Sequence, residues 1–270
     1  MPIPVPTPAV RAVVTGASQG IGRALATELA ARGHHLIVTA RREDKLRELA
    51  IRLTDEYAVT VDVRAGDLAD PTQRAELADE LAARPISILC ANAGTASLGP
   101  LTHLDHRAER AQVQLNVSAA HDLALAVLPG MLDRREGGIL FSGSTAGNAP
   151  MPNNATYAST KAFLNVFSES LHGELRGSGV HVTLLAPGPV RTGLPGELDA
   201  VYRVIPDFMW VSAEHTAKAA LNGLQRNRTR VVPGLPTKVT SAAGRYLPRA
   251  VVVAFAEKAF EKLDGEWSWT

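Results

Sequence analysis

The chain has 270 residues, 46% of them hydrophobic and 20% charged, with a formal net charge of +1. This length can bury a large core, and the balanced charge gives no indication of a nucleic-acid partner, which usually requires a basic surface. The single cysteine, Cys90, excludes an internal disulfide and suits a reducing compartment. The N-terminus MPIPVPTPAV lacks the basic region and apolar run of a secretory signal. These features predict a cytoplasmic protein.

From residue 10 onward, short apolar segments alternate with helical patterns. The predicted strands cover 11–15, 35–40, 58–63, 86–92, 137–144, 180–187 and 230–234. The predicted helices cover 20–32, 43–56, 71–83, 104–131, 155–177 and 213–224. Several strands are apolar almost throughout, as is typical of strands buried on both faces of a parallel sheet. The pattern predicts an α/β fold: a single Rossmann-fold domain whose doubly wound parallel sheet has about seven strands, with helices on both faces.

We predict three regions along the chain. Residues 1–9, with alternating prolines, form an extended arm. Residues 10–237 form the Rossmann-fold domain, in which the apolar stretch 193–212 is expected either to cover a binding site or only to pack on the domain. Residues 238–270 form a helical extension, with an amphipathic helix over 249–263.

The first predicted strand leads directly into the glycine-rich sequence TGASQGIGR. Glycines at a strand-to-helix turn allow backbone N–H groups to approach a pyrophosphate at the helix N-terminus. The spacing is G-x-x-x-G-x-G rather than the commoner G-x-G-x-x-G. The cofactor contacts predicted in this turn are Gly16, Ser18, Gln19, Gly20, Ile21 and Gly22.

The second predicted strand is followed by Arg41 and Arg42, without a carboxylate until Glu43. An acidic side chain at this point would favour NAD, whereas arginine favours the 2′-phosphate of NADP. The alternative is that both arginines are exposed charges at a helix start, although the helix dipole favours anions there. We therefore predict NADP(H) as the cofactor.

Later motifs appear in a characteristic order. They are GDLAD with Asp67, NAG at 92–94, VQLNVSA with Asn116, Ser144 thirteen residues before Tyr157, Tyr157-x-x-x-Lys161, and PGPVRT at 187–192. Together with TGASQGIG, they resemble the short-chain dehydrogenase/reductase family over about residues 10 to 235. The resemblance implies further cofactor contacts by Asp67, Leu68, Asn92, Ala93, Gly94, Tyr157, Lys161, Pro187, Gly188, Val190 and Thr192.

The same resemblance implies a catalytic tetrad of Asn116, Ser144, Tyr157 and Lys161. Tyr157 is expected to protonate a ketone oxygen, and Lys161, one helical turn away, is expected to lower the pKa of its phenol together with the nicotinamide ring. Ser144 is expected to bond the substrate carbonyl, and Asn116 is expected to hold a water that connects Lys161 to solvent. The intact tetrad argues against a non-catalytic NADP-binding regulator.

Other polar residues have simpler interpretations. Ser142 has the wrong spacing to Tyr157 for the family's serine. His34 and His35 lack companion ligands at metal spacing, so no metal site is expected. Cys90 lies within an apolar strand and is expected to be a core residue.

The substrate is less clearly indicated. The stretches RAVVTGASQGIG, LIVTARRED, ISILCANAGT and RVVPG resemble actinobacterial short-chain reductases of 3-oxo groups on long fatty acyl chains such as mycolate precursors. This implies reduction of an apolar lipid ketone, with a steroid, sugar or small carbonyl compound as the alternative. The family forms homodimers or homotetramers. The C-terminal helix is expected to pack on the domain or a sister subunit, with peripheral membrane contact as the alternative.

Overall fold

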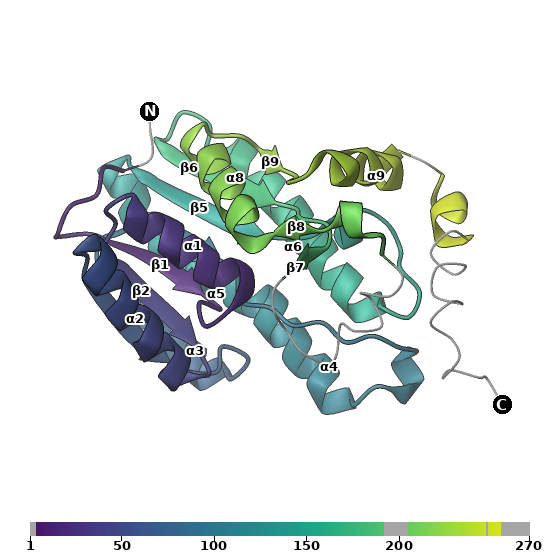
Figure 1. Ribbon diagram of the computed structural model, residues 1–270, viewed down its shortest axis with the longest axis horizontal. Helices are drawn as coiled ribbons and strands as arrows, with labels where there is room; N and C mark the ends of the chain where they lie inside the picture. Colours follow the sequence, from purple (N-terminus) through teal and green to yellow (C-terminus); the bar gives the residue numbers. More distant parts are fainter. Residues whose placement is uncertain (1–3, 192–204, 247, 255–270) are drawn as a thin grey trace.

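The structure, a computed structural model, describes residues 4–191, 205–246 and 248–254. Its centre is a seven-stranded sheet in the order β3-β2-β1-β4-β5-β6-β9, with every neighbouring pair parallel (Figure 1). The strands are β1 (Arg11–Thr15), β2 (Leu36–Ala40), β3 (Val61–Ala65), β4 (Ile86–Ala91), β5 (Gly137–Ser142), β6 (Val180–Leu185) and β9 (Arg230–Val231). The strand order reverses between β1 and β4, which is where such sheets bind ligands. The predicted fold class is confirmed.

Helices cover both faces of the sheet and form two separate cores. One face carries α1 (Gly20–Ala31), α2 (Glu43–Tyr57) and α8 (Ala213–Gln225). The other carries α3 (Pro71–Ala82), α5 (Ala119–Arg134) and α6 (Ala155–Glu174). The strands β1, β2, β4, β5 and β6 are almost completely buried, because apolar side chains of both faces are covered by helices.

The helix predicted over 104–131 differs from the structure. It consists of α4 (His106–Val113), a π-helical turn at Gln114–Ser118, and α5. Single π turns occur mostly inside α-helices and often at functional sites. The stretch His106–Arg134 is long and apolar enough to cross a membrane, but α5 packs on β4, β5 and α3 within the domain.

Two short strands were not predicted, and one helix begins before the helical extension predicted over 238–270. Strands β7 (Val190–Arg191) and β8 (Val211–Ser212) form a small parallel sheet, and a 3-10 turn at Asp207–Met209 precedes β8. Helix α9 (Leu235–Tyr246) follows β9 and lies beyond its end (Figure 1).

The three predicted regions stay predictions. Most of the predicted cover lies outside the described residues, since only 205–212 of it is described. Of the helix predicted over 249–263, residues 249–254 are described and are helical.

Candidate active site

The glycine turn joins β1 to α1 at the carboxyl edge of the sheet. Gly16 has φ +68°, in the left-handed region that favours glycine. A Cβ at Gly22 would lie 2.1 Å from the carbonyl oxygen of Gly16, so the turn can close this tightly only without that side chain. The N-cap residue Gln19 makes no side-chain capping bond, which leaves the first N–H groups of α1 available to an anion.

Arg42 and the glycine turn converge. Arg42 precedes α2, and its guanidinium donates to Ser18 Oγ at 3.2 Å and to Gln19 Oε1. Arg41 is exposed on the same strand-to-helix connection. Arg42 is therefore held beside the glycine turn, on the side that faces the end of β2.

The next two strand ends carry further residues that were predicted to contact the cofactor. Asp67 follows β3, where its Oδ1 accepts from the N–H of Ala69 at 3.0 Å, and Leu68 is buried beside it. After β4, Asn92 Nδ2 donates to the carbonyl of Thr15 at 3.1 Å, and Ser142 Oγ donates to Asn92 Oδ1 at 3.0 Å. Ser142 thus ties β5 to β4, which is a structural role.

Asn116 is completely buried on the π-helical turn. Its Nδ2 donates to the carbonyl of Thr95 at 2.9 Å and to Thr160 Oγ1 at 3.0 Å, while its Oδ1 accepts from the N–H of Thr95 at 2.9 Å. Asn116 therefore joins the loop after β4 to α6. A Cβ at Gly94 would meet both Asn116 Oδ1 (3.1 Å) and Lys161 Nζ (3.4 Å), so both groups lie close to Gly94.

Tyr157, Lys161 and Ser144 lie together. Tyr157 and Lys161 are one turn apart on α6, with Lys161 Nζ 5.6 Å from the centre of the Tyr157 ring. Lys161 is buried and donates to the carbonyl of Ser142 at 2.7 Å. Ser144 follows β5, and its hydroxyl hydrogen-bonds with Tyr157. The four residues predicted as a tetrad thus lie at one edge of the sheet.

Burial controls the charges of this site. It raises the pKa of the Tyr157 phenol, while the hydrogen bond with Ser144 opposes the rise. Burial also lowers the pKa of Lys161 to about 8. Desolvation is the largest effect on the phenol in this structure, and the expected lowering of its pKa by Lys161 together with a bound nicotinamide ring stays a prediction. Tyr157 is therefore a neutral proton donor over a wide pH range.

The loop after β6 closes the site from the other side. The carbonyl of Pro187 accepts from the N–H of Thr145 at 3.0 Å and from Ser144 Oγ at 3.4 Å. Gly188 and the buried Val190 continue this loop. Thr192 lies outside the described residues.

The arrangement fits a dinucleotide. Phosphates are suited by three features: the uncapped N-terminus of α1, the glycine turn that excludes side chains, and the neighbouring Arg42. The nicotinamide end would lie on the other side of β4, near Lys161 and the loop at Pro187. Among the residues that the structure describes, no three His, Cys, Asp or Glu side chains cluster as metal ligands.

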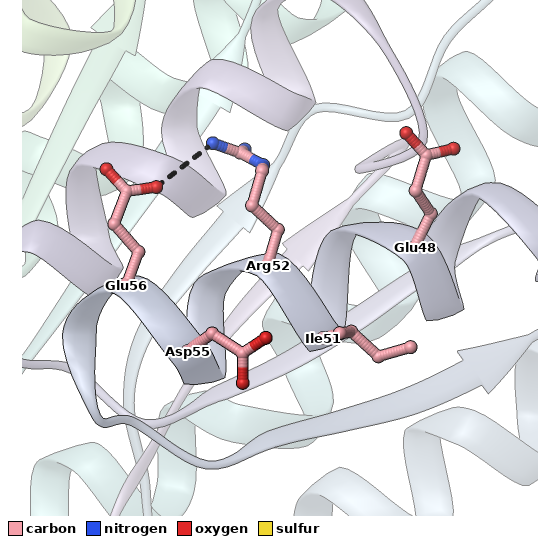
Figure 2. Close-up of a pocket in the computed structure, with 5 residues that line it drawn as sticks. All are labelled: Glu48, Ile51, Arg52, Asp55 and Glu56. Atoms are coloured by element: carbon pink, nitrogen blue, oxygen red, sulfur yellow. Dashed lines mark hydrogen bonds and ion pairs between the residues drawn. The ribbon is translucent and has the colours of Figure 1, made fainter.

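A surface hollow on α2 is a different kind of feature. Figure 2 shows its lining residues, all of them from this one helix: Glu48, Ile51, Arg52, Asp55 and Glu56. Arg52 pairs with Glu56 at 3.5 Å and also donates to Thr27 Oγ1 of α1 at 3.0 Å. We assign it no function, because these residues form an ordinary charged helix surface.

The prediction did not include Thr15, Thr160, Asn148 and Asn165, which hold the site residues in place. Thr15 Oγ1 accepts from the N–H groups of Asn92 (2.9 Å) and Ala93 (2.8 Å). Asn165 binds the backbone of Ser144. Asn165 lies eight residues after Tyr157 on the predicted helix. A polar residue at this position was the one indication in the sequence that Asn165 belongs to the site.

Comparison with known proteins identifies the class. Residues 10–202 match the short chain dehydrogenase family, so the chain belongs to this family and is an oxidoreductase. It is 30% identical over 254 residues to the very-long-chain 3-oxoacyl-CoA reductase of Mus musculus, covering 91% of this chain and 79% of the mouse protein.

Two solved structures are also similar. One is a short-chain dehydrogenase from Sphingobium yanoikuyae in complex with NADPH, with a TM-score of 0.78, 32% identity and coverage of 96% of this chain and 97% of that one. The other is the bulky-bulky ketone specific alcohol dehydrogenase from Comamonas testosteroni, with a TM-score of 0.76, 29% identity and coverage of 98% and 97%.

Proposed function

We propose that this protein is an NADPH-dependent reductase of an apolar ketone, and that Tyr157 is its proton donor. One observation carries the proposal: the half-buried phenol of Tyr157 lies beside the buried Lys161 and hydrogen-bonds with the Ser144 hydroxyl, at the strand ends next to the glycine turn. A phenol in this position can give its proton to the oxygen of a carbonyl group that Ser144 binds.

NADP(H) is the cofactor that these residues fit. The N-terminus of α1 and the turn from Gly16 to Gly22 would hold the pyrophosphate, and Arg42 and Arg41 would hold the 2′-phosphate. Asp67 and Leu68 would lie against the adenine, and Asn92–Gly94 against the central part of the cofactor. Pro187–Val190 and Thr192 would contact the nicotinamide.

When bound, NADPH supplies a hydride to the carbonyl carbon. Ser144 would donate a hydrogen bond to the carbonyl oxygen and fix its position. Tyr157 would transfer its phenolic proton to that oxygen as the C–H bond forms, which leaves an alcohol and a phenolate. Lys161, held by the carbonyl of Ser142, would stabilise the phenolate, and a water held by Asn116 would connect Lys161 to solvent, from which the proton is returned.

We propose a 3-oxo group on a long-chain fatty acyl compound as the substrate, with mycolate-like lipids as the finer possibility. The relationship to the mouse reductase supports an acyl substrate, and the structure from Comamonas testosteroni supports ketones with two large substituents. Exposed Phe208, in the 3-10 turn before β8, and exposed Leu235 of α9 provide apolar surface, and this turn contacts α9.

The substrate test compares NADPH oxidation, followed at 340 nm, with four probes: 3-oxopalmitoyl-CoA, a 3-ketosteroid, L-sorbose and a small aromatic ketone. The proposal predicts the highest kcat/KM with 3-oxopalmitoyl-CoA. A preference for the steroid, the sugar or the small ketone would retain the reductase and contradict the lipid substrate.

We also propose that the C-terminal part of the chain contacts membranes peripherally, which would bring a cytoplasmic enzyme to a lipid substrate. Leu235, Val239 and Tyr246 are more than half exposed on one face of α9, and Lys238 and Arg249 are exposed nearby. Co-sedimentation with phosphatidylglycerol vesicles should exceed that with phosphatidylcholine vesicles. If the protein sediments with neither kind of vesicle and light scattering shows a homodimer or homotetramer, this face would be assigned to a sister subunit instead.

A further inference from the structure

Ser144 is held at its backbone by a single side chain of α6. Its N–H donates to Asn165 Oδ1 at 3.4 Å, and its carbonyl accepts from Asn165 Nδ2 at 2.9 Å. Asn165 is only 3% exposed. Because one amide bonds both backbone groups, its orientation determines the direction of the Ser144 side chain.

Asn165 is connected in turn to the C-terminal helix α9. Its Nδ2 also lies 3.3 Å from Asn148 Oδ1, and Asn148 Nδ2 donates to Ser241 of α9, at 3.0 Å to Oγ and 3.3 Å to the carbonyl. Arg230 donates to Asn148 Oδ1 at 3.0 Å and pairs with Glu169 at 2.8 Å. A continuous chain of hydrogen bonds therefore runs from α9 to Ser144.

Helix α9 also touches the second loop of the site. A Cβ at Gly188 would lie 2.5 Å from Thr237 Cγ2, so the backbone of this loop rests directly against α9. The same loop binds Ser144 Oγ through the carbonyl of Pro187 at 3.4 Å. Ser144 is thus supported by α9 along two routes.

The two faces of α9 indicate that its packing serves the site more than the core. Thr237 and Ser241, one turn apart, are buried toward the domain, whereas Leu235, Val239 and Tyr246 are exposed on the opposite face. A helix that packs for hydrophobic stabilisation has the reverse arrangement. Of the two buried side chains that the structure describes in α9, Ser241 leads to Ser144 through hydrogen bonds, and Thr237 packs its methyl group against Gly188.

We propose that α9 is a positioning element of the active site, acting through Ser241, Asn148 and Asn165 to hold Ser144 in its catalytic orientation. The effect on turnover rests on the proposed role of Ser144 as the carbonyl-binding group. The effect on the order of the Ser144 loop does not depend on that role.

The first test is Ser241→Ala, with Thr240→Ala as the matched control. Thr240 is the neighbouring exposed hydroxyl of α9, and it bonds only the preceding turn, at the carbonyls of Pro236 and Thr237. Hydrogen–deuterium exchange of a peptide covering residues 143–148 should be about 2- to 10-fold faster in Ser241→Ala, the scale of one lost hydrogen bond, and unchanged in Thr240→Ala.

The second test is Asn148→Ala, alone and combined with Ser241→Ala. With 3-oxopalmitoyl-CoA, kcat should fall by about 10-fold in Asn148→Ala at an unchanged Kd for NADPH, and the double variant should lose no more. Exchange and kcat equal to Thr240→Ala in both single variants would overturn the proposal. If no carbonyl probe is reduced by the unaltered protein, the proposed function fails, and the exchange measurement still decides the positioning.

Discussion

At the scale of single residues, Lys161 determines the pH range of the reaction. Burial lowers its pKa to about 8, while the raised pKa of Tyr157 keeps that phenol protonated. The favourable charge of Lys161 is therefore present below this pH and is lost as the pH rises through it. We predict that kcat/KM for reduction falls above about pH 8. A pH profile that stays level to pH 10 would contradict the role of Lys161 as a cation.

Arg42 determines the choice of cofactor at the same scale. Substitution by alanine removes the guanidinium held over Ser18 and Gln19. We predict that Arg42→Ala raises the Kd for NADPH by about 10- to 100-fold, the scale of a charge-assisted bond, and leaves the Kd for NADH unchanged. Arg47→Ala is the control, since Arg47 is an exposed residue of α2 that pairs with Glu43. Equal effects of Arg42→Ala on both nucleotides would assign Arg42 a structural role.

The sequence predicted which residues meet at the site but not the bonds that hold them. Tyr157 and Lys161 could be placed together because four residues span one helical turn. The contact of Asn165 with Ser144 joins residues 21 apart, and no local periodicity encodes such a pairing. The sequence also did not indicate that burial raises the pKa of Tyr157, because burial depends on packing that the sequence does not show.

At the scale of elements, Arg74 fixes the π-helical turn that carries Asn116. The Arg74 side chain, on α3, is almost completely buried. It donates to Asp122 Oδ2 at 2.7 Å, to Gln114 Oε1 at 3.1 Å and to the carbonyl of Leu68 at 3.0 Å. We predict that Arg74→Met lowers the free energy of unfolding by about 2 to 3 kcal/mol.

Urea unfolding would measure this difference. Arg110→Met, at an exposed position of α4, serves as the control and should change the free energy of unfolding by less than about 0.5 kcal/mol. Equal destabilisation by the two substitutions would show that Arg74 does not hold α3 to the helix of Asn116.

Elements differ in how well the sequence predicted them, for physical reasons. Strand β5 was predicted from GGILFSGS because both its faces are buried and apolar. Helix α9 was predicted only as part of the helical extension over 238–270 and without its own bounds, because it contains Pro236 and Gly244, which are weak helix formers, and because its buried face is polar. The spacing of apolar residues does not reveal the π-helical turn, so the sequence predicted one uninterrupted helix over 104–131.

At the scale of the whole molecule, a buried histidine controls stability in acid. His34, between α1 and β2, is 3% exposed, and burial, with Arg32 and His35 nearby, lowers its pKa from 6.5 to about 4. The unfolded chain therefore binds a proton that the folded protein excludes between these values. Stability is fully present above about pH 6.5 and falls as the pH is lowered toward 4.

We predict a loss of about 2 kcal/mol of unfolding free energy between pH 7 and pH 5. Urea titrations at the two pH values measure it, and His34→Gln should remove most of the difference. An equal difference in His34→Gln would assign the acid sensitivity to other groups.

We propose above that Tyr157 supplies the proton in an NADPH-dependent ketone reduction. The most direct measurement compares the unaltered protein with Tyr157→Phe, using NADPH oxidation with the best carbonyl probe and NADPH binding by fluorescence. We predict an unchanged Kd for NADPH and a fall in kcat of about 10²-fold or more. Turnover within a few-fold of the unaltered protein, at equal NADPH binding, would contradict the assignment of Tyr157 as the general acid.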